Sequence, residues 1–449
     1  MIEPRSYLFV TWEGGGNVPA VLGVARQLAA RGHHVRVLAE PCMADAVTAA
    51  GAEFLPFTRH FTRSDAAEPL LEDFGARSPL AALTATFRGL MFGPAHIVAD
   101  ETRDAIAAQP TDVVVADYLM PGALVAAEAA RLPRAVLWHA PEYLPGPGRP
   151  AAGPGFAPRK DVIGTVRDGL LTSLFLRTLS PFVADYNKVR QRYGLAPVSG
   201  AKDLFGEYHR ADRRLIQTSK AFDFPLDPAP ANVRYVGPVL DDPHWVETEG
   251  TRSADSDTGG RPLVVAGFSS TYQKQEAALR NTIEALGTLP VTALVSTGPS
   301  VNLADITGAG TPANVTVSRA VSHAAAFPLA AAVVTHAGHG TIMRALTAGA
   351  PLVCLPMGRD QDDNAAKIAY HGAGVRLPKT ATPQRIAAAV RRVVDEPTFR
   401  ETARRLGEQI GRDAAEQRAV TELEGLAAGQ AGPQPSPRVD GTTEKVIAA

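Results

Sequence analysis

The chain has 449 residues, and its 45 Lys and Arg against 46 Asp and Glu give a formal net charge of −1. This length is enough for two domains of ordinary size, each with its own hydrophobic core. Because the chain is nearly neutral, it has no basic field that would attract nucleic acid or an anionic membrane surface. It also lacks the run of about eighteen apolar residues that a membrane helix needs, so we expect no membrane span.

The two cysteines, Cys42 and Cys354, are far apart in the sequence and lack the spacing of metal ligands. The chain opens on a strand-like run and a glycine loop rather than on a secretory signal. We therefore expect a cytoplasmic protein with two free thiols.

Short apolar runs alternate with helical patterns along the first half of the chain, which predicts parallel βαβ units. Residues 57–106 are harder to assign, because five phenylalanines lie there among small residues. Residues 141–158 are rich in Pro and Gly and too long for a tight turn, so we expect a functional loop. The expected strands cover residues 7–11, 34–39, 112–116 and 135–138, and the expected helices cover 19–31 and 122–130.

The second half repeats the α/β pattern after a polar, glycine-rich stretch over residues 241–261, which we expect to be a linker. A helical pattern covers residues 397–427, and the Pro- and Gly-rich tail after it is expected to be disordered. The whole pattern predicts an α/β fold of two doubly wound domains, with ligand sites at the carboxyl ends of their strands. The expected strands of this half cover residues 263–266, 291–296, 315–317, 331–335 and 352–355.

The segment from Thr335 to Thr341, THAGHGT, lies between an apolar strand-like run and a helical pattern. A glycine-rich turn from strand to helix leaves the first helical N–H groups unpaired, and such groups bind anions. Gly338 and Gly340 let a phosphate approach the backbone closely, and His336 adds a side-chain donor. This order of residues predicts a phosphate site in the second half.

Six segments together resemble one known family. The chain is similar to the inverting glycosyltransferases of the GT-B fold, family 1, in particular the bacterial enzymes that decorate natural products. In the first half the similarity rests on ARQLAARGHHV at 25–35, DVVVAD at 112–117 and NVRYVGP at 232–238. In the second half it rests on THAGHGT at 335–341, AGAPLV at 348–353 and DQDDNA at 360–365.

The resemblance implies two Rossmann-like domains that face a cleft. Residues 1–236 would bind an apolar natural-product acceptor, and residues 237–261 would be the linker. Residues 262–428 would bind a UDP- or dTDP-sugar, with a C-terminal helix that returns toward the first domain, and residues 429–449 would be a disordered tail. No cofactor is implied beyond this nucleotide-sugar co-substrate, and the protein would be a monomer or a homodimer.

The resemblance also assigns the donor site. His336 and the 338–341 backbone would hold a phosphate, hydroxyls after the first strand of the second domain would reach the pyrophosphate, and a turn with His323 would contact the nucleobase. Asp360 and Gln361 would bind sugar hydroxyls, so no metal is expected although Asp360 and Asp362 have carboxylate spacing. The donor set is His336, Gly338, His339, Gly340, Thr341, Asp360, Gln361, Ser269, Ser270, Thr271, Val321 and His323.

The usual base of the family is missing from this chain. The resemblance aligns Gly16 with the histidine of a Gly-His-x-x-Pro loop, which deprotonates the acceptor. Asp117, at the end of a strand, is our predicted replacement, and Glu13 in the same loop as Gly16 is the alternative. A carboxylate in an apolar pocket becomes a better base through desolvation. The candidate acceptor-binding residues are Trp12, Gly16, Asn17, Trp138 and His139.

Structural roles remain open for several of these residues. Asn17 is most simply a helix N-cap, Asp117 could merely end its strand, and the acidic run after Asp360 could be a solvated turn. His339 occupies a variable position of the family, which favours a structural role. The phenylalanines of residues 57–92 form either an ordinary core or a wall of the acceptor pocket.

The sequence therefore predicts an enzyme that moves a sugar from a nucleoside diphosphate to an apolar small molecule with inversion. Two alternatives remain. A catalytically silent relative that assists a partner enzyme is favoured by the missing histidine and disfavoured by the intact Asp360 and Gln361. A GT-B sugar-nucleotide epimerase is disfavoured by the Phe-rich 57–92 region and the 141–158 loop, which suggest a large acceptor.

Overall fold

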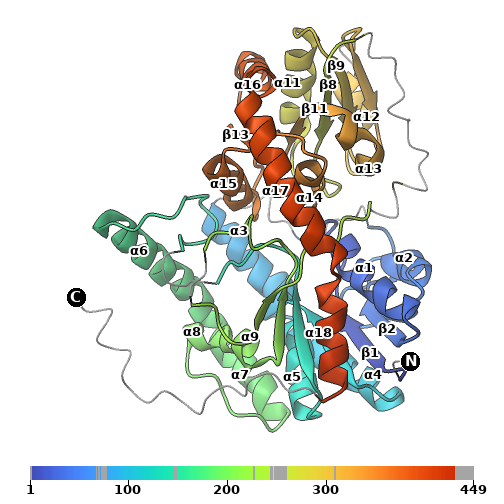
Figure 1. Cartoon of the computed structure of the whole chain (residues 1–449). Coiled ribbons are helices and arrows are strands. Elements are labelled where there is room, and N and C mark those ends of the chain that lie inside the picture. Colours follow the sequence, from blue (N-terminus) through green and yellow to red (C-terminus); the bar gives the residue numbers. More distant parts are fainter. Residues whose placement is uncertain are drawn as a thin grey trace.

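The computed structural model describes residues 3–66, 68, 71, 78–144, 149–225, 228–242, 246, 260–307 and 310–429. Most of the predicted linker and the whole predicted tail lie outside these residues, as do Phe74 and residues 145–148 of the predicted functional loop. The described residues form two lobes, each built on one parallel β-sheet (Figure 1).

The sheet of the N-terminal lobe has seven parallel strands in the order β3-β2-β1-β4-β5-β6-β7. Its central strands are buried on both faces, which explains their nearly continuous apolar sequences. The strands are β1 Ser6–Val10, β2 His34–Ala39, β3 Glu53–Pro56, β4 Val113–Asp117, β5 Arg134–Trp138, β6 Arg213–Ile216 and β7 Val233–Tyr235.

The helices of this lobe cover both faces of the sheet (Figure 1). In the region that was hard to assign, Phe57, Phe61, Phe87 and Phe92 are all buried in one core cluster, as in an ordinary core. The helices are α1 Asn17–Ala30, α2 Ala44–Ala49, α3 Pro79–Thr86, α4 Ala95–Ala108, α5 Pro121–Ala129, α6 Val162–Leu179, α7 Val183–Arg192, α8 Ala201–Leu204 and α9 Gly206–Arg210.

The C-terminal lobe has a six-stranded parallel sheet in the order β10-β9-β8-β11-β12-β13. Its strands are β8 Leu263–Gly267, β9 Thr292–Ser296, β10 Val315–Ser318, β11 Ala330–Thr335, β12 Leu352–Cys354 and β13 Gly374–Arg376. Its helices are α11 Glu276–Gly287, α12 Leu303–Thr307, α13 His323–Ala326, α14 His339–Thr347, α15 Gln361–His371 and α16 Pro383–Asp395.

Two helices connect the lobes at the end of the described chain. The single helical pattern over 397–427 is in fact α17 Pro397–Ala415 and α18 Arg418–Ala427, because Gln417 adopts a left-handed conformation with φ of 49°. α17 packs on α14 of the C-terminal lobe, and α18 contacts α1 of the N-terminal lobe (Figure 1).

The order of each sheet reverses at its first strand, so β1 lies between β2 and β4, and β8 lies between β9 and β11. Ligand sites of doubly wound sheets lie at the carboxyl ends of the strands at such a reversal. The loop after β1 and the end of β4 therefore mark one candidate region, and the loops after β8 and β11 mark the other. Within the described ranges no helix is long and apolar enough to cross a membrane.

Candidate active site

The predicted phosphate turn lies between β11, which ends at Thr335, and α14, which begins at His339 with Gly338 as its N-cap residue. Ala337 has a φ of 70°, which reverses the chain direction between the two elements. The N–H of Ile342 donates to the carbonyl of Gly338 at 3.1 Å. The helix therefore makes no use of the N–H groups of residues 339–341, and these can bind an anion.

His336 lies against this turn and is buried. A Cβ on Gly338 would lie 2.5 Å from Nε2 of His336, so only glycine leaves room for the imidazole. Burial lowers the pKa of His336 to about 4, although the main chain of Gly267 opposes the shift. The imidazole is therefore neutral at neutral pH, and a bound phosphate would meet a polar group rather than a cation.

Asp360 and Gln361 lie at the start of α15 and differ in how many of their side-chain polar atoms bond to the protein. Asp360 Oδ2 accepts hydrogen bonds from Nδ2 of Asn364 at 2.7 Å and from the hydroxyl of Tyr143 at 3.2 Å. Gln361 Oε1 accepts main-chain N–H groups, and Nε2 donates to Oε1 of Gln273 at 2.8 Å. Among the described residues, Asp360 Oδ1 accepts no hydrogen bond and one amide hydrogen of Gln361 has no acceptor, so both could serve a ligand.

The hydroxyl loop after β8 continues this network. Ser269 Oγ accepts a hydrogen bond from Nε2 of Gln273 at 2.8 Å. Gln273 therefore joins Gln361, at the start of α15, to this loop. Gln273 is not among the predicted site residues, because nothing in the local sequence pattern shows that its amide bridges two loops. Ser270 and Thr271 lie against the N-terminal lobe, where a Cβ on Gly15 would come within 2.8 Å of both side chains. The glycine loop therefore meets the hydroxyl loop directly.

The turn expected at the nucleobase leads into α13. Val321 is buried in the core, and His323 begins the helix. The His323 imidazole stacks on Phe327, with ring centroids 4.2 Å apart, and its Nδ1 is buried without a hydrogen-bond partner. Burial lowers the pKa of His323 to about 3, so this ring is neutral.

His339 bridges the two lobes. It is buried, and its Nε2 lies 2.9 Å from Oγ1 of Thr218 in the N-terminal lobe. Burial lowers the pKa of His339 to about 4. The main-chain N–H of this residue faces the anion turn, while its side chain has a structural contact.

Asp117 ends β4 with its side chain fully buried. Oδ1 accepts the main-chain N–H of Leu119 at 2.9 Å. Oδ2 accepts the hydroxyl of Thr11 at 3.3 Å and Nδ2 of Asn17 at 3.2 Å, and it also lies 3.3 Å from Nε2 of His139. Both oxygens therefore face protein donors.

The remaining acceptor-side candidates differ in accessibility. Trp12 and Trp138 are buried in the core of the N-terminal lobe, whereas Gly16 is exposed.

The expectation that Asn17 caps α1 is wrong, because Gly16 is the N-cap residue. The Asn17 amide instead donates to the carbonyl of Trp12 at 2.8 Å and to Asp117. Half-buried Glu13 accepts a hydrogen bond from the N–H of Gly15 at 2.7 Å, and desolvation raises its pKa to about 7.

Half of the predicted functional loop is held on the C-terminal lobe. Asp363 of α15 accepts the main-chain N–H of Gly153 at 2.5 Å and that of Gly155 at 2.8 Å. Arg376 donates to the carbonyl of Gly155 at 2.8 Å. The loop therefore reaches across to the helix that begins next to Asp360.

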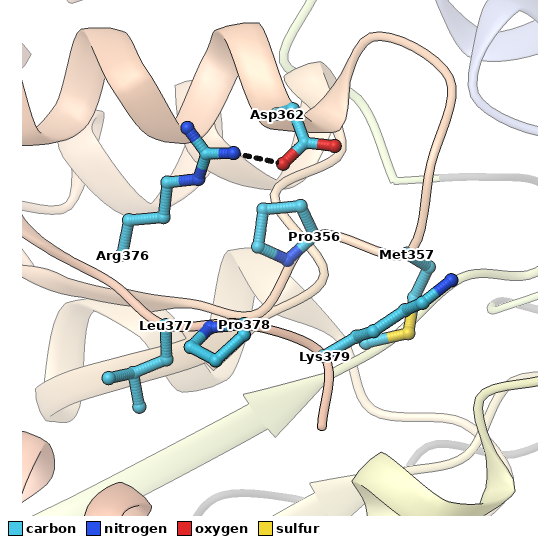
Figure 2. A pocket seen from close by; sticks show the side chains of 7 residues that line it. All are labelled: Pro356, Met357, Asp362, Arg376, Leu377, Pro378 and Lys379. Atoms are coloured by element: carbon cyan, nitrogen blue, oxygen red, sulfur yellow. Dashed lines mark hydrogen bonds and ion pairs between the residues drawn. The ribbon is translucent and has the colours of Figure 1, made fainter. Parts of the chain in front are cut away.

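A separate cavity of about 480 Å³ opens beside β12 and β13 (Figure 2). An ion pair between Asp362 and Arg376 crosses it. None of the predicted site residues lines this cavity, so we place the chemistry at the loops between the lobes. The cavity is lined by Pro356, Met357, Asp362, Arg376, Leu377, Pro378 and Lys379.

Two parallel-sheet α/β lobes with facing loops are the arrangement of the GT-B glycosyltransferases. Comparison with known proteins agrees. Residues 273–426 match the family model described as erythromycin biosynthesis protein CIII-like, C-terminal domain. The crystal structure of CalG4, the calicheamicin glycosyltransferase, aligns with a TM-score of 0.72 and 20% identity over 95% of this chain and 99% of that chain.

Two relatives extend the match to most of the sequence. The chain is 32% identical over 436 residues to 4'-demethylrebeccamycin synthase of Lentzea aerocolonigenes, covering 93% of this chain and 99% of the relative. It is 29% identical over 375 residues to glycosyltransferase GtfE of Amycolatopsis orientalis, covering 82% and 85%. The chain belongs to the family of GT-B glycosyltransferases of antibiotic biosynthesis. Family 1 enzymes of this fold act with inversion and without a metal ion.

Proposed function

We propose that the C-terminal lobe, residues 262–428, holds a UDP- or dTDP-sugar and that the N-terminal lobe, residues 1–236, presents an apolar natural product to it. The observation that carries this proposal is the turn of residues 335–341, where the N–H groups of residues 339–341 have no acceptor within α14. A diphosphate is the anion that such a turn accommodates. Asp360, with Oδ1 free, would then bind a sugar hydroxyl.

Aromatic rings of the N-terminal lobe support an apolar, ring-containing acceptor. The Tyr143 hydroxyl donates to Asp360, and burial, together with the charge of Asp360, raises the pKa of Tyr118. Both tyrosines are half-buried, and they border the region between Asp117 and Asp360. The relative named 4'-demethylrebeccamycin synthase also supports a natural product as acceptor.

The test measures donor binding and transfer separately. Calorimetry with UDP and with dTDP should give a lower affinity for His336→Ala than for the wild type. A hydrogen bond to a charged phosphate contributes about 1.5–3 kcal/mol, so the affinity should fall roughly ten-fold or more. His96→Ala, which removes an exposed histidine on α4, should leave it unchanged. Equal affinity of His336→Ala and wild type would show that His336 is not part of the donor site.

In the second arm, the wild type is incubated with UDP- and dTDP-sugars and a panel of polyaromatic and macrolide acceptors. Glycosylated products should be detected by mass spectrometry. No transfer with any donor and acceptor would contradict the proposed acceptor class.

A further inference from the structure

An imidazole does lie beside Asp117, although it comes from a different loop than in the related enzymes. β4 and β5 are neighbours, with Asp117 in register with Leu137, and His139 follows directly after β5. Nε2 of His139 and Oδ2 of Asp117 are 3.3 Å apart, within ion-pair distance. Position 16, by contrast, is an exposed glycine with open space around its Cβ direction.

Asp117 is poorly placed to touch an acceptor itself. Its side chain has no exposed surface, and Leu119, Thr11 and Asn17 supply donors to both oxygens. A carboxylate that accepts several hydrogen bonds is stabilised in its charged form and is a weaker base. It can nevertheless orient a neighbouring imidazole and stabilise it when protonated.

The two nitrogens of His139 have different surroundings. Nε2 is shielded from solvent and makes no hydrogen bond with the described residues, and Oδ2 of Asp117 lies 3.3 Å from it. No hydrogen bond to Nδ1 occurs among the described residues. The side chain keeps 12% of its surface exposed. The ring therefore has one protein-facing nitrogen and one nitrogen available to a ligand.

His139 also faces the donor half of the molecule. Its ring centroid is 4.7 Å from that of Tyr118, which stacks on Trp138 with ring centroids 4.4 Å apart. The ring centroids of Trp138 and Tyr143 are 6.4 Å apart, and the Tyr143 hydroxyl donates to Asp360 at 3.2 Å. The imidazole thus lies between the predicted acceptor side and the predicted sugar.

We propose that His139 is the general base of the transfer and that Asp117 is its positioning residue. The acceptor oxygen or nitrogen forms a bond to the anomeric carbon, and the bond from that carbon to the diphosphate breaks with its electron pair. The acceptor proton passes to Nδ1 of His139, and the resulting imidazolium keeps Nε2–H toward Asp117. This inference rests on the proposed function, because the base is needed only for transfer to an acceptor.

The test compares His139→Ala, Asp117→Asn and the double variant with wild type and with His96→Ala as the control histidine. kcat and KM are measured with an acceptor that the wild type glycosylates, together with UDP affinity and the urea unfolding midpoint. General-base catalysis contributes about 10²–10⁴-fold, so His139→Ala should lower kcat by such a factor. UDP affinity and the unfolding midpoint should stay near the wild-type values.

Two further readouts separate the base from a structural role. Imidazole added to the buffer should restore part of the kcat of His139→Ala, and it should not raise that of wild type. Asp117→Asn should lower kcat, and the double variant should lose little more than His139→Ala, because the two residues act as a unit. Additive losses would overturn the positioning role of Asp117.

Normal turnover of His139→Ala would overturn the proposal, as would a loss that imidazole does not restore and that accompanies a lower unfolding midpoint. Abolished turnover in Glu13→Gln with normal turnover in His139→Ala would place the base in the loop after β1. Failure of the proposed function would be distinct, because the wild type itself would then transfer sugar to no acceptor.

Discussion

Glu13 illustrates how burial alters a single carboxylate near the site. The main-chain N–H of Glu13 donates to Glu40, its carbonyl accepts from Arg63, and its carboxylate accepts from the N–H of Gly15. Desolvation outweighs these contacts and raises the pKa of Glu13 from 4.5 to about 7. Between pH 4.5 and about 7, Glu13 is therefore protonated in the folded state, whereas the same carboxyl group is ionised in the unfolded chain.

This shift predicts a pH-dependent effect of Glu13→Gln on stability. Between pH 4.5 and about 7 the folded state holds more protons at this position, so the free energy of unfolding falls as pH rises. Replacing the carboxyl with an amide should leave stability at pH 5 nearly unchanged and raise it at pH 8 by on the order of 1 kcal/mol, given partial solvent screening. Urea unfolding at the two pH values measures the difference. Equal effects at both values would contradict the assigned shift.

At the scale of elements, α15 links the proposed sugar site to the loop after β5. Asp363 and Arg376 both bond the main chain of Gly155, and burial raises the pKa of Asp363. Gly155 has a φ of 70°, and a Cβ there would lie 2.5 Å from the carbonyl oxygen of Asp362. Only glycine therefore fits between the loop and the start of the helix.

Gly155→Ala should displace the loop from α15 and disturb Asp360, which precedes that helix. The left-handed conformation alone costs a side chain about 1–2 kcal/mol. We expect a several-fold higher KM for the donor sugar and a lower unfolding midpoint. Gly169→Ala, in α6 with open space around its Cβ direction, is the matched control and should leave the donor KM unchanged. A normal donor KM for Gly155→Ala would mean that the loop contact does not influence the sugar site.

At the scale of the whole molecule, the last two helices hold the lobes together. Ala403, Leu406 and Ile410 of α17 belong to a core cluster of the C-terminal lobe. Val420 and Leu423 of α18 belong to a core cluster of the N-terminal lobe. Glu424 adds an ion pair with Arg31 at 2.9 Å and a hydrogen bond with His33 at 3.1 Å. α18 therefore completes a core of the N-terminal lobe.

Leu423→Ala tests this contribution. Leu423 is fully buried, so its truncation should cost about 2–5 kcal/mol through lost apolar burial and a residual cavity. Urea unfolding followed by tryptophan fluorescence reports on the N-terminal lobe, where Trp12 and Trp138 are buried. Leu329→Ala, at a position 58% exposed, should change stability by less than about 0.5 kcal/mol. Similar effects of the two substitutions would show that α18 adds nothing to this core.

Local sequence determined the elements and the anion turn. The apolar runs that end in Thr335 and Asp117 form buried strands, and the glycines at 338 and 340 lie at the start of α14, because strand burial and turn conformation depend on residues close together in the chain. α6 was not predicted, since it buries only Gly164 and Leu179 and so lacks a clear apolar period.

Only the tertiary structure decided which side chains meet. Parallel strands bring together residues far apart in the chain, and periodicity cannot name these partners. His139 lies beside Asp117 because β5 pairs with β4, and Tyr143 reaches Asp360 because the lobes face each other. The sequence by itself therefore determined a glycosyltransferase-like fold with a phosphate turn. The surroundings of Asp117, and with them the proposed base, depended on the packing of separate strands.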